Sequence, residues 1–518
     1  MSASQMHENR FSRYLKVLVS NYTAFLINVG TYAVTVPLLL QWLGPEQYGV
    51  WLIFLQLNSL VLFGTMWTAA PIAREAASCY VHPDSRNTRQ LFQTALAYCT
   101  VCGLGVIVLT LPFSHVFLQF FQVPPGLWAD AARAIILLSL YTAGSMQLNL
   151  LYSMLTGFQQ MHIANFLLGT PAALGTILGI GAICLGWELS GLAAGYVVGA
   201  VILYSIGWRA ARQINGVAFG FAHFDRNLLR ALHRSGSSYC VYAIAYVLLQ
   251  SDIFLVGFLL GPTAAAVYGV AYKLMDYLVQ LIWKIPDSLF PTIAELDIRE
   301  GSKNLHAVHS LSGKFAIAIA FLLAIPLALY GHAGLSLWLG PDHAAPQTVF
   351  IAFSIIMVSQ VIVHSSLAIS YGTNRMSAIA WVALVEGALK VILALLLIPQ
   401  IGLVGVALST VLAQLSLTTW YVPLSACKLT GDTLRSYFSR TILPALPAAL
   451  VGSALGTLML FLTSNRWVQV CIGAPLSMAA YTVMYINSCL RSDERQWLAD
   501  KFQSIPGWQK LVATRREA

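Results

Sequence analysis

Residues 17–45, VLVSNYTAFLINVGTYAVTVPLLLQWLGP, decide the fold class of this chain. The run contains no charged side chain, and it is long enough to cross a hydrocarbon core that needs about 20 helical residues. The whole chain of 518 residues is 58% hydrophobic and only 9% charged, whereas soluble proteins carry about 25% charged residues. Its mean hydropathy is +0.71. The composition predicts an all-α polytopic membrane protein, because the period-two alternation of a membrane barrel is absent.

Fourteen segments of the chain are apolar enough to cross a membrane as helices. We expect them near residues 17–43, 48–72, 91–111, 133–156, 163–186, 189–208, 236–260, 264–290, 315–338, 346–371, 377–399, 403–424, 441–463 and 467–489. With a cytoplasmic N-terminus, most of the 29 Lys and Arg residues fall in cytoplasmic segments, as the positive-inside rule requires. We therefore expect a multi-pass protein of the bacterial inner membrane with both termini in the cytoplasm.

The basic residues also predict contact with membrane lipids. The formal net charge of +9 is attracted to anionic headgroups, so no nucleic-acid partner is needed to explain it. Arg226, Arg230 and Arg234 recur every four residues beside leucines, which is typical of an amphipathic helix on the inner leaflet. His306 and His309 are expected on a solvated face of a polar loop. The eight scattered cysteines indicate neither a disulfide framework nor a metal site, and we expect no cofactor.

A weak internal repeat divides the chain. Residues 43–50, LGPEQYGV, recur as residues 260–270, LGPTAAAVYGV, and shorter matches follow at similar offsets. A duplication of six helices predicts two six-helix lobes related by an axis along the membrane normal, followed by two C-terminal helices. The expected parts are an N-lobe (1–208), a basic cytoplasmic linker (209–235), a C-lobe (236–424), a final helix pair (425–490) and a cytoplasmic tail (491–518).

The order of these motifs resembles that of polysaccharide exporters of the O-antigen flippase type. Their superfamily also includes the multidrug/toxin extruders and the lipid II flippase. The residues that carry the resemblance, which extends over residues 11–425, are Asn21, Asn28, Pro37, Leu43-Gly44, Tyr48-Gly49-Val50-Trp51, Arg74, Asp252, Tyr268, Lys273 and Pro291.

The resemblance implies a two-lobed transporter that works by alternating access. It implies a central cavity and a substrate made of an oligosaccharide linked to undecaprenyl diphosphate, carried from the inner to the outer leaflet during lipopolysaccharide or exopolysaccharide synthesis. A polysaccharide polymerase and a chain-length regulator are the protein partners expected with such a function.

Seven charged side chains fall inside the predicted spans, where each costs about 3 kcal/mol or more unless it meets a partner or a wet cavity. They are Asp252, Lys273, Asp276, Lys284, Asp287, Glu386 and Lys390. The four on span 264–290 lie within a sector of roughly 80°. Asp252 and Lys273 are similarly distant from the turn at Pro262, so we expect them to pair. Glu386 and Lys390 form an i, i+4 pair.

Two interpretations of these charges remain open. They neutralise each other as internal ion pairs of the second lobe, or they line the cavity between the lobes. In the second case Lys273 and Lys390 bind the diphosphate, and Arg74 receives it at the cytoplasmic end of the second span. The residues expected to couple an ion or to pair internally are Asp252, Asp276, Glu386, Lys284 and Asp287.

Two other functions compete with the flippase. One is a multidrug/toxin cation antiporter of the same superfamily. The other is a membrane-embedded glycosyltransferase or O-antigen polymerase, which the outer connections near 112–132 and 339–346 do not favour because they carry few acid or base groups. We therefore expect a transporter and not an enzyme.

Overall fold

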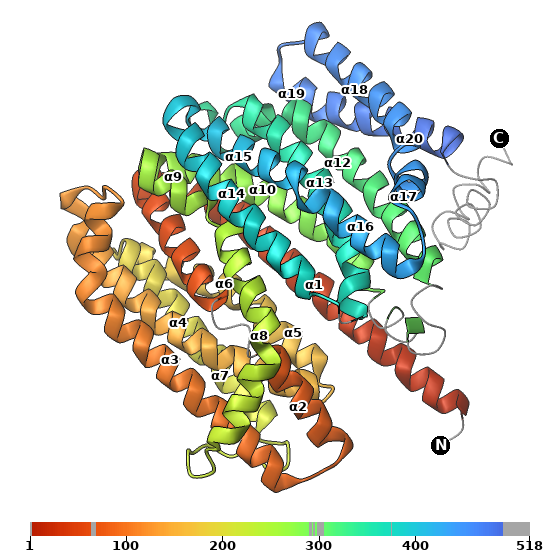
Figure 1. The fold of residues 1–518 in the computed structure, drawn as a ribbon. Coiled ribbons are helices and arrows are strands. Elements are labelled where there is room, and N and C mark those ends of the chain that lie inside the picture. The colour runs from red at the N-terminus through yellow and green to blue at the C-terminus, as the bar shows by residue number, and fades with distance from the viewer. Residues whose placement is uncertain are drawn as a thin grey trace, which may run out of the picture. The chain divides into compact units, whose positions relative to one another are not determined.

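The computed structural model describes residues 3–63, 69–289, 293, 296–297, 305–373 and 375–489. All secondary structure within these residues is helical (Figure 1), which confirms the predicted all-α fold. Pro291 and the expected tail (491–518) lie outside the described residues.

The helices of the first half follow the expected spans. They are α1 (Ala3–Phe63), α2 (Ala69–Val81), α3 (Ser85–Phe120), α4 (Trp128–Gly157), α5 (Met161–Gly169), α6 (Pro171–Cys184), α7 (Leu189–Ala211), α8 (Arg226–Leu249), α9 (Asp252–Leu260) and α10 (Pro262–Asp287).

The second half continues the pattern. Its helices are α12 (His306–Leu339), α13 (Gln347–Gly372), α14 (Ser377–Ile401), α15 (Leu403–Ser416), α16 (Thr418–Thr430), α17 (Leu434–Thr441), α18 (Ala445–Leu462), α19 (Arg466–Val468) and α20 (Ala474–Ser488). A π-helical stretch, Gln469–Gly473, joins α19 to α20. Each of the fourteen expected segments overlaps one or more of these helices within the described residues.

The number of spans is close to the expected fourteen. Ten helices of the described chain are long and apolar enough to cross a membrane, or up to twelve if the bent pairs α5–α6 and α8–α9 each count as one span. Helix α1 is counted as one span although Gly44 interrupts it. The charged helix α10 is not among the counted helices.

The repeated LGP turns have the same backbone conformation. Gly44 has φ 76° and ψ 166°, and Gly261 has φ 85° and ψ 175°, a region that favours glycine because side chains clash there. The two turn regions also approach each other closely. A Cβ atom added at Gly49 would lie 1.8 Å from the carbonyl oxygen of Pro262, so the packing requires glycine at that position.

The helices group into two compact units. Unit 1 comprises Met1–Tyr272 and Met376–Ala413, and unit 2 comprises Lys273–Arg375 and Gln414–Ala518. This division differs from the predicted lobes because α14 packs along α8 and so joins unit 1. The lobes themselves stay a prediction.

Small residues set the helix packing in unit 1. A Cβ atom at Gly195 of α7 would lie 2.2 Å from the backbone nitrogen of Gly179 in α6, the kind of close approach that small residues allow between membrane helices. At the start of α7, Asp130 of α4 accepts hydrogen bonds from the backbone N–H and the hydroxyl of Ser190. The carboxylate thus satisfies a free donor at a helix N-terminus.

The basic segment before span seven is part of a longer helix. Asp225 accepts hydrogen bonds from the backbone N–H groups of Asn227 and Leu228, at 2.7 and 3.3 Å, and so caps α8. Arg226, Arg230 and Arg234 therefore lie in the first turns of α8, and the helix continues without a break to Leu249.

Unit 2 holds the final helices against α12. The Tyr481 hydroxyl of α20 donates to the carbonyl of Ala318 at 2.9 Å, and the Tyr330 hydroxyl of α12 donates to the carbonyl of Gly456 in α18 at 2.7 Å. These bonds place the polar ends of two large aromatic side chains inside the packed helices.

Candidate functional site

The first polar cluster forms where span seven is broken. Helices α8 and α9 meet at an angle of 43°, and the break leaves backbone carbonyls without their usual helical partners. The Lys390 ammonium donates to the carbonyl of Leu249, and the Gln56 side-chain amide donates to the carbonyl of Gln250. Because an unpaired backbone group costs several kcal/mol in lipid, these side chains stabilise the broken helix.

Lys390 also forms a buried ion pair with Asp252. Its Nζ atom lies 2.7 Å from Asp252 Oδ1, and the two side chains are only 2% and 6% exposed. The Tyr268 hydroxyl donates to the other carboxylate oxygen at 3.3 Å. Removing either charge leaves the other buried without compensation, which costs about 3–5 kcal/mol.

The expected pairing of Asp252 with Lys273 is therefore wrong. The similar distances of Asp252 and Lys273 from the turn at Pro262 predict how far along α10 Lys273 lies. They do not predict in which direction its side chain points around the helix. Tyr268 is the α10 residue that contacts Asp252, and Lys273, five residues further on, points about 140° away from Tyr268 around the helix. Helix α14 supplies the cation instead.

Gly387 allows α14 to approach α8. A Cβ atom at this position would lie 2.7 Å from Leu248 Cβ and 3.2 Å from the Ala245 carbonyl oxygen. Lys390 lies three residues later, on nearly the same face, and so reaches the end of α8. Glu386, the other charged residue of α14, is also buried.

The second cluster is the charged stripe on the part of α10 that belongs to unit 2. Lys273 Nζ lies 2.7 Å from Asp276 Oδ2, and the Lys273 side chain is 37% exposed. The Gln280 amide donates to the same carboxylate oxygen at 2.8 Å. The Lys273 ammonium also lies 4.9 Å from the centre of the Tyr277 ring, within range of a cation–π contact. Lys284, further along α10, is half-buried.

A histidine that the sequence analysis did not select completes this stripe. His364 Nε2 of α13 lies 2.8 Å from Asp287 Oδ1, and its ring stacks on Trp283 with centroids 4.3 Å apart and planes at 12°. The sequence did show that His364 is a titratable residue within span 346–371, a span that holds no Asp, Glu, Lys or Arg. Arg74, in contrast, is exposed on α2.

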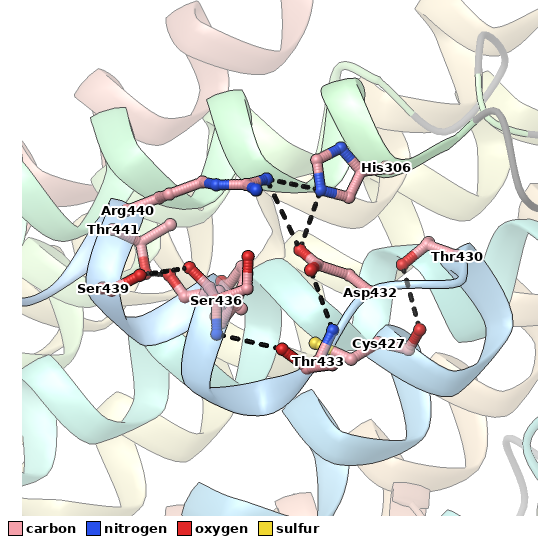
Figure 2. A network of polar contacts seen from close by, with 10 residues as sticks. His306, Cys427, Thr430, Asp432, Thr433, Ser436, Ser439, Arg440 and Thr441 are labelled. Atoms are coloured by element: carbon pink, nitrogen blue, oxygen red, sulfur yellow. Dashed lines mark hydrogen bonds and ion pairs between the residues drawn. The ribbon is translucent and has the colours of Figure 1, made fainter.

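The third cluster lies in unit 2 between α12 and the α16–α17 turn. Figure 2 shows the Asp432 carboxylate facing both His306 and Arg440, which lie side by side. Asp432 Oδ2 lies 2.9 Å from His306 Nε2 and 3.8 Å from the Arg440 guanidinium. Burial opposes ionisation of this carboxyl, but hydrogen bonds from Thr433 and Ser436 together with the two basic groups outweigh it and lower the pKa of Asp432.

The expected solvated face for His306 and His309 is wrong for His309. Its side chain is 1% exposed, Nε2 lies 3.1 Å from the Ser366 hydroxyl, and the ring stacks on Tyr437 at 4.3 Å. His309 is buried because α17 packs against α12 and covers this part of the helix. His306, one turn earlier, is half-buried in the Asp432 cluster.

Comparison with solved structures gives the fold. The lipid II flippase MurJ, in an inward closed conformation, is 14% identical with a TM-score of 0.69, over 92% of this chain and 98% of that chain. An inward-facing multidrug resistance MATE family transporter of the MOP superfamily is 14% identical with a TM-score of 0.65, over 81% and 99%. A MOP superfamily transporter from Pyrococcus furiosus is 14% identical with a TM-score of 0.57, over 80% and 96%.

Sequence comparison gives the family. No curated protein sequence matches the chain significantly. The family model described as "Polysaccharide biosynthesis protein" matches residues 15–297, more than half of the chain. The protein therefore belongs to the polysaccharide biosynthesis protein family.

Proposed function

We propose that this protein is a flippase for lipid-linked oligosaccharides and not an enzyme. It moves a glycan attached to a polyprenyl diphosphate from the inner to the outer leaflet of the bacterial inner membrane, during lipopolysaccharide or exopolysaccharide synthesis. The observation that carries this proposal is the match of residues 15–297 to a polysaccharide biosynthesis family. A polysaccharide polymerase and a chain-length regulator are its proposed partners.

The charged clusters suggest where the diphosphate binds. An anionic group must be desolvated to cross a low-dielectric interior, and a cation on its route offsets that cost. Lys273 suits this role because its side chain is 37% exposed on the span expected over residues 264–290 and its ammonium lies 2.7 Å from Asp276. Arg74, exposed on α2, would contact the diphosphate first at the cytoplasmic end of its span.

Lys390 is less accessible to a substrate than Lys273. It is buried and fully engaged with Asp252 and the Leu249 carbonyl. It would bind substrate only in a state in which this pair has opened. In the described conformation it holds the break between α8 and α9.

A cation antiporter is the second candidate. It is favoured by the likeness to a multidrug resistance MATE family transporter, which covers 99% of that chain. Such a protein would bind cations, and its site would then need accessible carboxylates; Asp276 and Asp287 are the half-buried carboxylates of α10.

A leaflet assay distinguishes the two functions. After depletion of the protein, lipid-linked oligosaccharide should accumulate in the inner leaflet of cells with an active glycan pathway, and the wild-type gene should reverse this. Unchanged leaflet distribution combined with loss of resistance to cationic drugs would favour the antiporter instead.

A further inference from the structure

The connection between α7 and α8, residues 212–225, exposes three phenylalanine side chains. Phe219 is 65% exposed, Phe221 49% and Phe224 46%. The rings of Phe219 and Phe221 have centroids 6.1 Å apart, and Phe219 also lies 6.2 Å from Trp208 at the end of α7. The sequence analysis did not select these three residues, which we call the aromatic patch. Grouped apolar side chains that stay exposed mark a surface that contacts another molecule.

Helix α3 holds this connection in place (Figure 1). The Gln93 side-chain amide donates to the carbonyl of Ala218 at 3.2 Å, and its oxygen accepts from the backbone N–H of His223 at 2.8 Å. The backbone N–H of Asp225 donates to the Thr94 hydroxyl at 3.0 Å. These bonds satisfy backbone groups on both sides of the phenylalanines. The exposure of the three rings is therefore built into the folded connection.

The aromatic patch lies where two spanning helices change from charged to apolar. Helix α3 has no charged residue after Arg89, and α7 has none before Arg209. The connection contacts α3 at Gln93 and α7 at Trp208, each within about one turn of those arginines. Such a change in a membrane helix marks the boundary between hydrocarbon and headgroups. Two helices thus place the patch at the same boundary.

Arginines outnumber carboxylates in the segments that meet at this boundary. Residues 84–94 and 209–230 contain two carboxylates, Asp84 and Asp225, and each of them accepts backbone N–H groups as a helix cap. The same residues contain six arginines, all exposed. They are Arg86, Arg89, Arg209, Arg212, Arg226 and Arg230. The excess positive charge attracts an anionic partner.

Apolar rings next to cations at the edge of a bilayer fit an anionic phospholipid. The rings lie among the acyl chains beside the headgroups, as in other interfacial segments that combine aromatic and basic residues. The guanidinium groups donate hydrogen bonds to the phosphate. A soluble protein would have to displace lipid headgroups to reach rings at this level, so the lipid matches the surface better.

We propose that residues 212–225, with the arginines that adjoin them, form a docking surface for anionic phospholipids of the leaflet expected to face the cytoplasm. Phe219, Phe221 and Phe224 insert beside the headgroups, and the arginines bind the phosphate. The surface ties this end of unit 1 to the charge of the leaflet. The proposal does not rest on the flippase function, because its ligand is the bilayer lipid and not the transported molecule.

Photo-crosslinking tests which molecule covers the aromatic patch. The photoreactive residue p-benzoylphenylalanine replaces Phe219, Phe221 or Phe224 in the full-length protein, which is placed in nanodiscs of phosphatidylcholine and phosphatidylglycerol at a known ratio. After irradiation, mass spectrometry identifies the covalent adduct. We expect phospholipid adducts in which phosphatidylglycerol is enriched several-fold over the bulk ratio. Leu450, 72% exposed on the uncharged helix α18, is the matched control position and should give adducts at the bulk ratio.

The arginines have their own readout in this experiment. Arg226→Gln combined with Arg230→Gln should bring the adducts at Phe221 close to the bulk lipid ratio, while the total amount of lipid adduct stays nearly the same because the ring remains at the boundary. High salt should act in the same direction, since exposed charges are screened. Lys428→Gln with Arg435→Gln, which removes two exposed basic residues of unit 2, is the control and should preserve the enrichment.

Three results would overturn the proposal. One is the absence of lipid adducts at all three positions while the Leu450 position is labelled. Another is a lipid ratio at the patch equal to that at Leu450. The third is a protein or polyprenyl adduct in place of the phospholipid when the same variants are irradiated in cells, which would assign the patch to a partner protein or to the transported substrate. If one variant does not fold, the other two positions decide.

Discussion

Two ion pairs of this protein have the same length and opposite surroundings. Lys390–Asp252 in unit 1 and Lys273–Asp276 in unit 2 both have an N–O distance of 2.7 Å. The first is almost completely buried between helices that are far apart in the sequence. The second joins neighbours on one helix, and its lysine is 37% exposed. Equal geometry therefore does not mean an equal role.

The physical difference is desolvation. Burial of Lys390 and Asp252 removes both charges from water, so each depends on the other and on the Leu249 carbonyl and Tyr268 hydroxyl around them. Lys273 keeps part of its surface open and gains little stability from Asp276, because partly exposed pairs contribute about 0–1 kcal/mol. The buried pair is suited to hold structure, and the open pair is suited to meet an anionic ligand.

The largest expected effect follows from breaking the buried pair. Lys390→Gln should lower the stability of the folded protein by about 3–5 kcal/mol, because Asp252 is left buried and uncompensated. Folded protein is measured by fluorescence-detected size exclusion after heating. Lys273→Gln is the matched control and should melt like the wild type.

A charge swap sharpens this prediction. Exchanging the two residues, Asp252→Lys with Lys390→Asp, should recover part of the folded protein. Equal melting of Lys390→Gln and Lys273→Gln would show that burial does not separate the two pairs.

The next effect concerns the approach of α14 to α8. Gly387→Ala places a methyl group where Leu248 Cβ would be 2.7 Å away, so we expect a loss of about 1–3 kcal/mol from overpacking. The same thermal measurement applies. Gly181→Ala, where an added Cβ has no atom within 4 Å, is the control, and an equal loss at both positions would contradict the packing argument.

The open pair should affect transport and leave folding unchanged. Lys273→Gln should insert at normal levels but flip lipid-linked oligosaccharide roughly tenfold more slowly, since a charge-assisted hydrogen bond to the diphosphate contributes about 1.5–3 kcal/mol. Lys273→Arg should rescue part of the rate, because it keeps the charge in a different shape. Full transport by Lys273→Gln would return Lys273 to the role of an internal ion-pair partner.

The smallest effect comes from the Asp432 cluster, which is intermediate in exposure. Its folded pKa is lowered from the ordinary value of 3.8, so ionised Asp432 stabilises the fold above about that pH. The contribution disappears as pH falls through the lower, folded pKa. Asp432→Asn should therefore lose roughly 1 kcal/mol at pH 7, and its difference from the wild type should shrink as the pH falls below the ordinary carboxyl range. Thermal melting over a series of pH values from 7 downward measures this, and a difference that does not change with pH would contradict it.

The LGP turns are the part of the fold that local sequence specified most directly. Gly44 and Gly261 take the same positive-φ conformation before a proline in both halves, because proline starts a helix well and glycine ends one well. The apolar runs likewise predicted where each helix lies, since a backbone in lipid must satisfy its own hydrogen bonds.

The sequence by itself thus determined that this protein lies in a membrane, where its helices lie, and which charged residues need a partner there. Only the tertiary structure decided which partners they found. Lys390 pairs with Asp252, and His364 with Asp287, across 138 and 77 residues of sequence. Hydropathy and spacing give the depth of a side chain and its face on one helix. Which residue faces that side chain depends on how the helices pack. Here Gly387 allows α14 to approach α8, and α17 covers His309.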